Sequence, residues 1–95
     1  MNAFVQRDWL QEIEDGTMIT SAEMQIYVNR LGTQREFTAR ELAAALNFKA
    51  VSSVYALVDA GKIGYINKGR GKKRYCVFPR ESVLMFLQKR CNQVF

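Results

Sequence analysis

Hydrophobic residues recur at helical spacing through the first two thirds of the chain and then change to alternation. Between residues 3 and 60 the apolar positions lie three and four residues apart, the period of an amphipathic helix. From Lys62 to Phe78 the period shortens to two, around a glycine-rich run at 68–72. The pattern predicts helices over residues 3–14, 20–31, 39–46, 50–60 and 80–91 and strands over 62–67 and 73–78, a mainly α fold with a small β-hairpin.

Two helix starts carry the spacing of a capping box. Thr20 is followed three residues later by Glu23, and Thr38 by Glu41, so each pair can exchange side-chain to backbone hydrogen bonds. In the second helix Ile26 lies outside the main apolar stripe. We therefore expect this helix to be covered on two sides, with Ile26 facing the first helix.

The first and last helices hold more apolar side chains than a small domain is expected to bury. Such surplus surface predicts a homodimer in which the terminal helices pair across a two-fold axis. The alternative is that the two helices pack on each other within a monomer. The candidate interface residues are Trp9, Leu10, Ile13, Leu84, Met85, Phe86 and Leu87.

Charge divides the chain into two halves. Residues 1–61 hold 5 basic and 8 acidic side chains, whereas residues 62–95 hold 9 basic and 1 acidic. A basic end of this density predicts a polyanionic partner, with nucleic acid first and an anionic membrane surface or an acidic protein behind it. The longest apolar run, residues 83–87, is too short to cross a bilayer, and the first residues do not resemble a secretion signal. We expect a cytoplasmic protein with no membrane partner.

The residue types argue against an enzyme. The chain has no histidine, so nucleophilic and general acid-base schemes lack their usual partner. Its two cysteines, Cys76 and Cys91, cannot form a four-ligand zinc site and are expected to be reduced packing residues. We expect no catalytic residues, no metal and no cofactor, and the sequence indicates no small-molecule ligand.

Residues 37–63 carry a family resemblance. The stretch 37–48 reads FTARELAAALNF and the stretch 52–63 reads SSVYALVDAGKI. Together with the basic hairpin that follows, they resemble the winged helix-turn-helix superfamily of small prokaryotic and phage transcriptional regulators. The length and composition predict one domain, residues 1–95. The resemblance divides it into a helical extension at 1–19, a winged helix-turn-helix core at 20–79 and a C-terminal helix at 80–95.

Double-stranded DNA is the partner that this resemblance implies. Two short helices joined by a tight turn must cross steeply, which exposes the outer face of the second helix, about residues 50–60, to a major groove. The helix-turn-helix spans residues 38–60, and the hairpin at 63–78, here called the wing, would meet the minor groove or phosphates. The candidate contacts are Thr38, Arg40, Lys49, Ser52, Ser53, Tyr55 and Ala56 from the helices and Lys68, Arg70, Lys72, Lys73 and Arg74 from the wing.

Several features favour other interpretations. Asp59 on the second helix opposes phosphate, and this helix is poor in the Arg, Asn and Gln that read bases, so we expect the wing to supply most of the affinity. The main alternative is a winged-helix adaptor whose basic hairpin docks on an acidic protein. RNA is a third possibility, although the sequence indicates no exposed aromatic pair of the kind that reads single strands.

Overall fold

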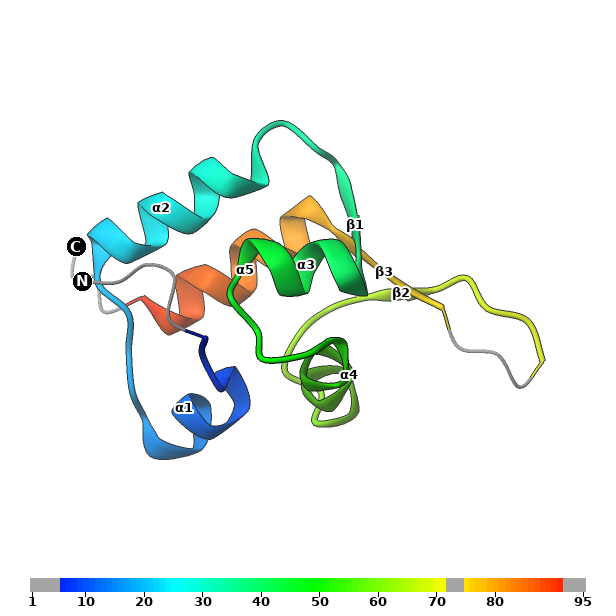
Figure 1. The fold of residues 1–95 in the computed structure, drawn as a ribbon, viewed down its shortest axis with the longest axis horizontal. Coiled ribbons are helices and arrows are strands. Elements are labelled where there is room, and N and C mark those ends of the chain that lie inside the picture. The colour runs from blue at the N-terminus through cyan, green and yellow to red at the C-terminus, as the bar shows by residue number, and fades with distance from the viewer. Residues whose placement is uncertain (1–5, 72–74, 92–95) are drawn as a thin grey trace.

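The computed structural model of the chain describes residues 6–71 and 75–91, and within them it is mainly helical (Figure 1). A small three-stranded antiparallel sheet completes the fold, so the predicted fold class is confirmed at this level. The helices are α1 (Trp9–Asp15), α2 (Ser21–Leu31), α3 (Ala39–Ala45), α4 (Val51–Asp59) and α5 (Arg80–Arg90), and the strands are β1 (Glu36–Thr38), β2 (Ile66–Asn67) and β3 (Cys76–Pro79).

Both predicted capping boxes are confirmed. The Thr20 hydroxyl accepts the backbone N–H of Glu23 at 3.1 Å, and the Thr38 hydroxyl accepts that of Glu41 at 3.1 Å. The predicted second covered side of α2 is wrong, since Ile26 is 40% exposed. Helix α2 buries one face only, which packs against α3 and α5.

The sheet has the strand order β1-β3-β2. The strand predicted over residues 62–67 is shorter than expected and corresponds to β2 alone. Phe37 of β1 pairs with Phe78 of β3, and Ile66 of β2 pairs with Val77. Residues 62–65 are outside the sheet, because Ile63 turns into the core and the backbone at Gly64 passes close to α5. A Cβ at Gly64 would lie 2.8 Å from the Ser82 hydroxyl, which shows how closely this segment lies against α5.

Trp9 of α1 lies at the centre of the core. Its ring is 5.5 Å from that of Tyr27 and 5.4 Å from that of Phe86, measured between centroids, and both pairs meet edge to face. The indole Nε1 donates to the carbonyl oxygen of Leu46 at 2.8 Å, directly after α3. One side chain therefore joins α1, α2, α5 and the end of α3.

The structure corrects the predicted dimer interface. Trp9, Phe86 and Leu87 are buried within their own chain, and Leu10, Ile13 and Leu84 pack against the same core. The apolar residues of the terminal helices are thus used inside one chain, because the two helices meet through the rings of Trp9 and Phe86. Of the seven candidates Met85 alone is exposed, at 59% of its surface.

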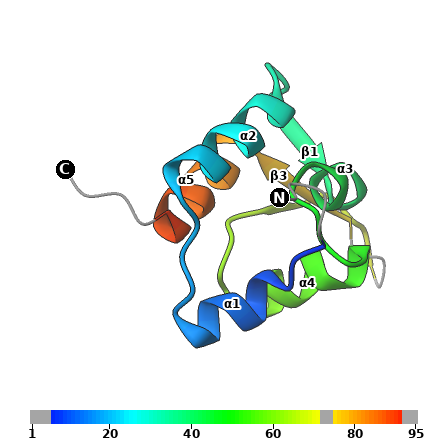
Figure 2. The same ribbon diagram turned by 60° about the vertical axis from the view of Figure 1, so that its left-hand side comes forward.

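Arg7 fixes the segment before α1 to the rest of the fold. Its backbone N–H donates to the Asn47 carbonyl at 2.7 Å, and its guanidinium bonds the carboxylates of Glu12 and, at 2.8 Å, Glu23. The hydrogen bond to Glu12, opposed in part by burial, raises the pKa of Arg7 above its ordinary value. This network holds α1 against α2, and α1 also lies alongside α4 (Figure 2).

In the described ranges, 6–71 and 75–91, no helix is both long enough and apolar enough to cross a bilayer.

Candidate nucleic-acid interface

Helices α3 and α4 meet at a steep angle through a turn that contains no glycine. Figure 1 shows α3 lying across the view while α4 is seen nearly end-on. Asn47 supplies the left-handed backbone of this turn, with a φ of 59°, a conformation that asparagine tolerates better than most residues. Phe48 then enters the core, which anchors the turn before α4 begins.

The outer face of α4 is narrow and carries little charge. Val54, Leu57 and Val58 are buried, whereas Ser52 and Asp59 are exposed. The other predicted contacts on this helix, Ser53, Tyr55 and Ala56, are half-buried, and Tyr55 packs against the core. Because α1 lies alongside α4, less of the helix is open to a groove than its sequence pattern predicts.

The N-terminus of α4 has no side-chain cap. Its N-cap residue is Ala50, whose backbone is extended with φ −159° and ψ 164° but whose methyl group accepts no hydrogen bond. Helix N-termini present backbone N–H groups and a partial positive charge, which suit an anionic acceptor. Ser52 lies in this first turn, and Lys49 lies just before the helix. Three groups that can bind a phosphate are therefore neighbours in the sequence: the backbone N–H groups of the helix start, the Ser52 hydroxyl and the Lys49 ammonium.

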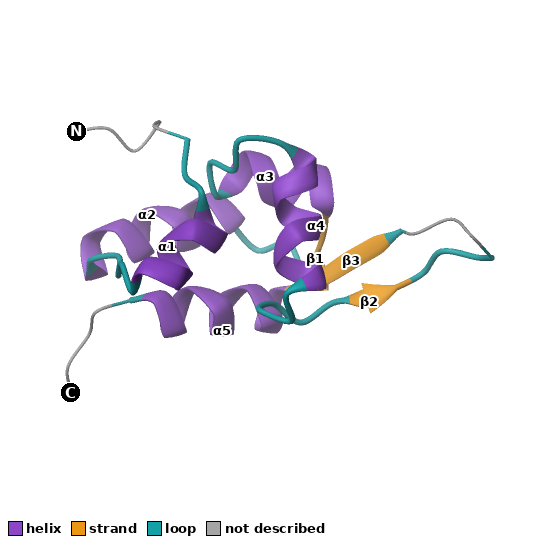
Figure 3. Ribbon diagram, turned by 90° about the horizontal axis from the view of Figure 1, so that it is seen from below, coloured by secondary structure: helices purple, strands orange, loops and turns teal. Residues whose placement is uncertain are grey.

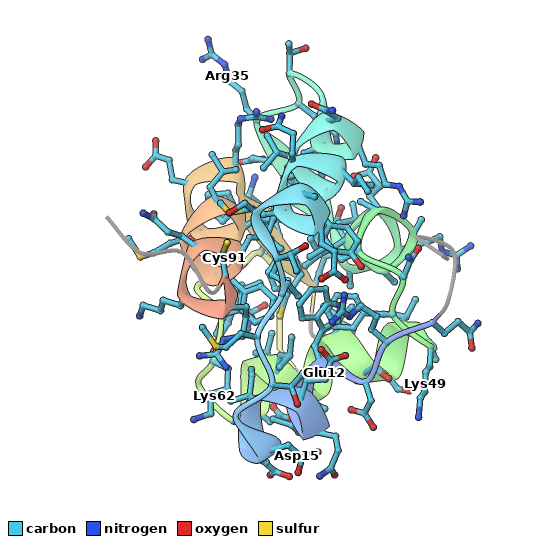
Figure 4. All side chains as sticks on the ribbon, turned by 90° about the vertical axis from the view of Figure 1, so that its left-hand side faces the viewer. Glu12, Asp15, Arg35, Lys49, Lys62 and Cys91 are labelled. Carbon is cyan, nitrogen blue, oxygen red and sulfur yellow. The ribbon has the colours of Figure 1, made fainter. Side chains whose placement is uncertain are left out.

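Two cations of the predicted site are held by weak surface ion pairs. The ammonium of Lys49 is 3.5 Å from a carboxylate oxygen of Asp8, and that of Lys68 is 3.3 Å from one of Glu36. All four side chains are about half exposed, and pairs of this kind contribute at most about 1 kcal/mol. A phosphate can therefore displace either carboxylate at small cost. Figure 4 shows Lys49 and Lys62 at opposite ends of α4.

The remaining predicted contacts of the α3 region differ in availability. The Thr38 hydroxyl already accepts the Glu41 N–H, which leaves its own hydrogen for an acceptor outside the chain. Arg40 is exposed on α3 and makes no hydrogen bond or ion pair with the described residues. Arg40 is thus the cation of this region that is free to meet a phosphate.

The wing projects away from the helices as a thin hairpin, seen at the right of Figure 1. Its closing hydrogen bond runs from the Lys68 N–H to the Tyr75 carbonyl at 2.8 Å, and Gly71 takes a positive φ of 61°. Arg70 is exposed near the tip. The other predicted wing cations, Lys72, Lys73 and Arg74, lie outside the described residues.

The hairpin also exposes aromatic side chains, which the sequence interpretation did not expect. Tyr65 and Tyr75 are 46% and 48% exposed. From the register of Ile66 with Val77, Tyr75 lies opposite Lys68 and on the same face as Ile66. Alternation could not have predicted this exposure, because Val77, on the same face of the strand as Tyr75, is buried; Tyr75 is exposed because it precedes the buried residues 76–78 of β3.

Residues 6–71 and 75–91 contain no group of three or more His, Cys, Asp or Glu side chains placed to hold an ion. Cys76 and Cys91 are both buried and form no disulfide with each other, as expected of packing residues.

Comparisons of the chain with protein-family models, with curated proteins and with solved structures found no match. Function is therefore inferred from the geometry of this chain.

Proposed function

We propose that the protein is a non-enzymatic DNA-binding protein of the winged helix-turn-helix type that acts as a transcriptional regulator. The observation that carries the proposal is the succession of a capped α3, a tight turn, a steeply crossing α4 and a projecting basic hairpin. Proteins with a helix-turn-helix place the second helix in a major groove while flanking elements grip the backbone. Here α4 is the recognition helix and the β2–β3 hairpin is the wing.

Affinity in this arrangement comes mainly from phosphate contacts. Lys49 and the uncapped start of α4 meet one strand, and Lys68 and Arg70 follow the adjacent groove or its phosphates. Ser52 is the exposed polar side chain of α4 that can reach a base edge. Since α4 offers few groups that read bases, sequence preference depends largely on DNA shape and deformability.

The salt dependence of binding tests this proposal. About six phosphate contacts per protomer predict a slope of about −5 for log affinity against log salt concentration on duplex DNA. Replacing Arg70→Ala should weaken binding to all duplexes and reduce the magnitude of the slope by about 1. Fluorescence anisotropy of a labelled random duplex between 50 and 200 mM salt, a range in which such contacts dominate, measures both quantities.

Arg35 provides a matched control for Arg70. It is an exposed arginine on the opposite side of the molecule from α4, as Figure 4 shows. Arg35→Ala should leave affinity and slope unchanged. Equal behaviour of the Arg70 and Arg35 variants would contradict a role for the wing in DNA binding.

A second candidate function is an adaptor that docks on an acidic protein. It is favoured by Ile66 and Tyr75, which expose apolar surface on one face of the hairpin beside Lys68. The same duplex titration separates the two functions, since an adaptor shows no binding to random duplex DNA at low salt. Tight binding to single-stranded RNA but not to duplex would instead favour stacking on the exposed tyrosines.

A further inference from the structure

The outward face of α5 belongs neither to the core nor to the proposed DNA site. Glu81, Met85, Gln88 and Lys89 are exposed along it, and Met85 is the most exposed large hydrophobic side chain of the described residues. In Figure 3, which views the molecule from below, α5 runs along the lower side of the helical part, and the β2–β3 hairpin lies beyond its right-hand end. These four side chains are accessible to a partner.

The charges on this face are arranged symmetrically about Met85. Glu81 lies four residues before it and Lys89 four residues after it, about 6 Å along the axis in each direction at 1.5 Å per residue. Neither side chain has an ion-pair partner among the described residues. When such a face meets a second copy in antiparallel orientation, Met85 opposes Met85 and Glu81 opposes Lys89 at both ends. The face is therefore complementary to itself, as a two-fold interface requires.

Space for the second methionine adjoins the first. A cavity of about 230 Å³ lies between α5 and the segment that follows α4, lined by residues 61–64 and by Ser82, Met85, Phe86 and Lys89. Ile63 and Phe86 give it an apolar floor. A methionine side chain is flexible and unbranched, so it adapts readily to an irregular site of this kind.

We propose that the partner of this face is a second copy of the chain and that α5 pairs antiparallel with α5 around Met85. The interface differs from the one that the sequence predicted, since it is centred on Met85 on the outside of α5, and of the buried predicted residues it involves Phe86 alone, in the floor of the cavity. One helix face is smaller than the roughly 800 Å² per partner of a standard interface, so the dimer is weak and depends on concentration.

The symmetry has a consequence for DNA that rests on the proposed function. A two-fold dimer repeats α4 and the wing in symmetry-related positions, and such symmetry matches the two half-sites of a palindromic DNA sequence.

A charge-reversal cycle tests the antiparallel pairing. Glu81→Lys and Lys89→Glu each place like charges opposite one another twice per dimer, and each should weaken self-association several-fold in sedimentation velocity. The double variant E81K/K89E should restore it, because the pairs are re-formed with their signs exchanged. A monomer at all concentrations up to several hundred micromolar, or a double variant as weak as the singles, would overturn the proposal.

Disulfide trapping gives an independent test. Both native cysteines are buried, so Met85→Cys provides the exposed thiol, and on a two-fold axis it meets its own copy. Mild oxidation should convert this variant to covalent dimer much faster than Ile26→Cys, a control at an exposed position on α2. Equal rates would overturn the proposal. Both tests are done without DNA, so a dimer that fails to bind duplex refutes the proposed function alone.

Discussion

Helices α3 and α4 are neighbours of similar length whose first turns are built in opposite ways. Thr38 and Glu41 close the start of α3 with a complete capping box, and Gln34 donates a further hydrogen bond to the Glu41 carboxylate at 3.0 Å. Ala50 begins α4 with no side-chain hydrogen bond at all. The start of α3 is therefore satisfied from within the chain, whereas the start of α4 is left for solvent or a ligand.

The two helix starts differ in their consequences: the start of α3 adds stability to the fold, and the start of α4 is available to a ligand. A satisfied cap stabilises a helix by about 1 kcal/mol, and α3 has this contribution. Helix α4 depends instead on tertiary packing, because Val54 and Leu57 are fully buried and α1 lies alongside. An uncapped N-terminus is tolerated where packing already holds the helix.

The largest expected effect comes from removing the side chain that supports both helices. Trp9→Ala deletes the ring contacts of the core and the hydrogen bond to the Leu46 carbonyl, which lies between α3 and α4. We expect a loss of about 3–5 kcal/mol in the free energy of unfolding, measured by urea denaturation. Trp9→Phe keeps an aromatic ring but leaves that carbonyl without its donor, and should cost about 1–3 kcal/mol. A loss below about 1 kcal/mol for Trp9→Ala would contradict its central role.

The cap of α3 gives the next effect. Thr38→Ala removes the acceptor of the Glu41 N–H and should lower the free energy of unfolding by about 1 kcal/mol. Thr38→Ser retains the hydroxyl and serves as the control. If both variants were equally stable, the capping box would not be what stabilises the start of α3.

Adding a cap to α4 should have two opposite results. Ala50 already has the extended backbone of an N-cap residue, so Ala50→Asp should stabilise the protein by about 0.5 kcal/mol. The new carboxylate also repels phosphate, and duplex affinity should fall. Ala50→Ser, which caps without charge, separates the two effects in parallel melting and anisotropy measurements. An Ala50→Asp variant with unchanged duplex affinity would place the DNA away from the start of α4.

The smallest effect is a dependence on pH. The backbone N–H of Thr38 holds the pKa of the Glu41 carboxyl below its ordinary value of 4.5, and that of Thr20 does the same for Glu23. A carboxyl whose pKa is lower in the folded state contributes stability above pH 4.5, and this is lost as the pH falls through the lower folded value. Melting temperatures between pH 6 and 3 should therefore fall less steeply for Glu41→Gln than for Glu14→Gln, an exposed carboxylate outside the caps. Parallel curves for the two variants would show that the Glu41 bond adds no pH-dependent stability.

Local chemistry accounts for the parts of the fold that sequence reasoning predicted well. The boxes at Thr20 and Thr38 involve residues three apart, and Gly32 ends α2 next to the last apolar position, so each boundary is visible in a short window. The helix predicted over residues 50–60 agrees with α4 because its apolar positions recur at helical spacing and Gly61 follows it.

The features of the fold and of the candidate site that the sequence did not predict depend on contacts between residues far apart in the chain. No short window shows that Gly64 passes against Ser82, which keeps residues 62–65 out of the sheet. Arg7 carried no motif, yet it bonds to both Glu12 and Glu23. The coverage of α4 by α1, which narrows the candidate site, likewise depends on where Trp9 packs.

The meeting of α1 and α5 in one core bears on how the protein is made. Backbone pairing of Ile19 with Cys91 and the contact of Trp9 with Phe86 require α5, which is synthesised after α1 to α4. Until α5 is available, α1 to α4 lack part of the surface on which they pack, so the core closes only after α5 has been made. A premature stop codon before α5 would yield a chain with an open core that cellular proteases degrade, and not a shortened protein with partial activity.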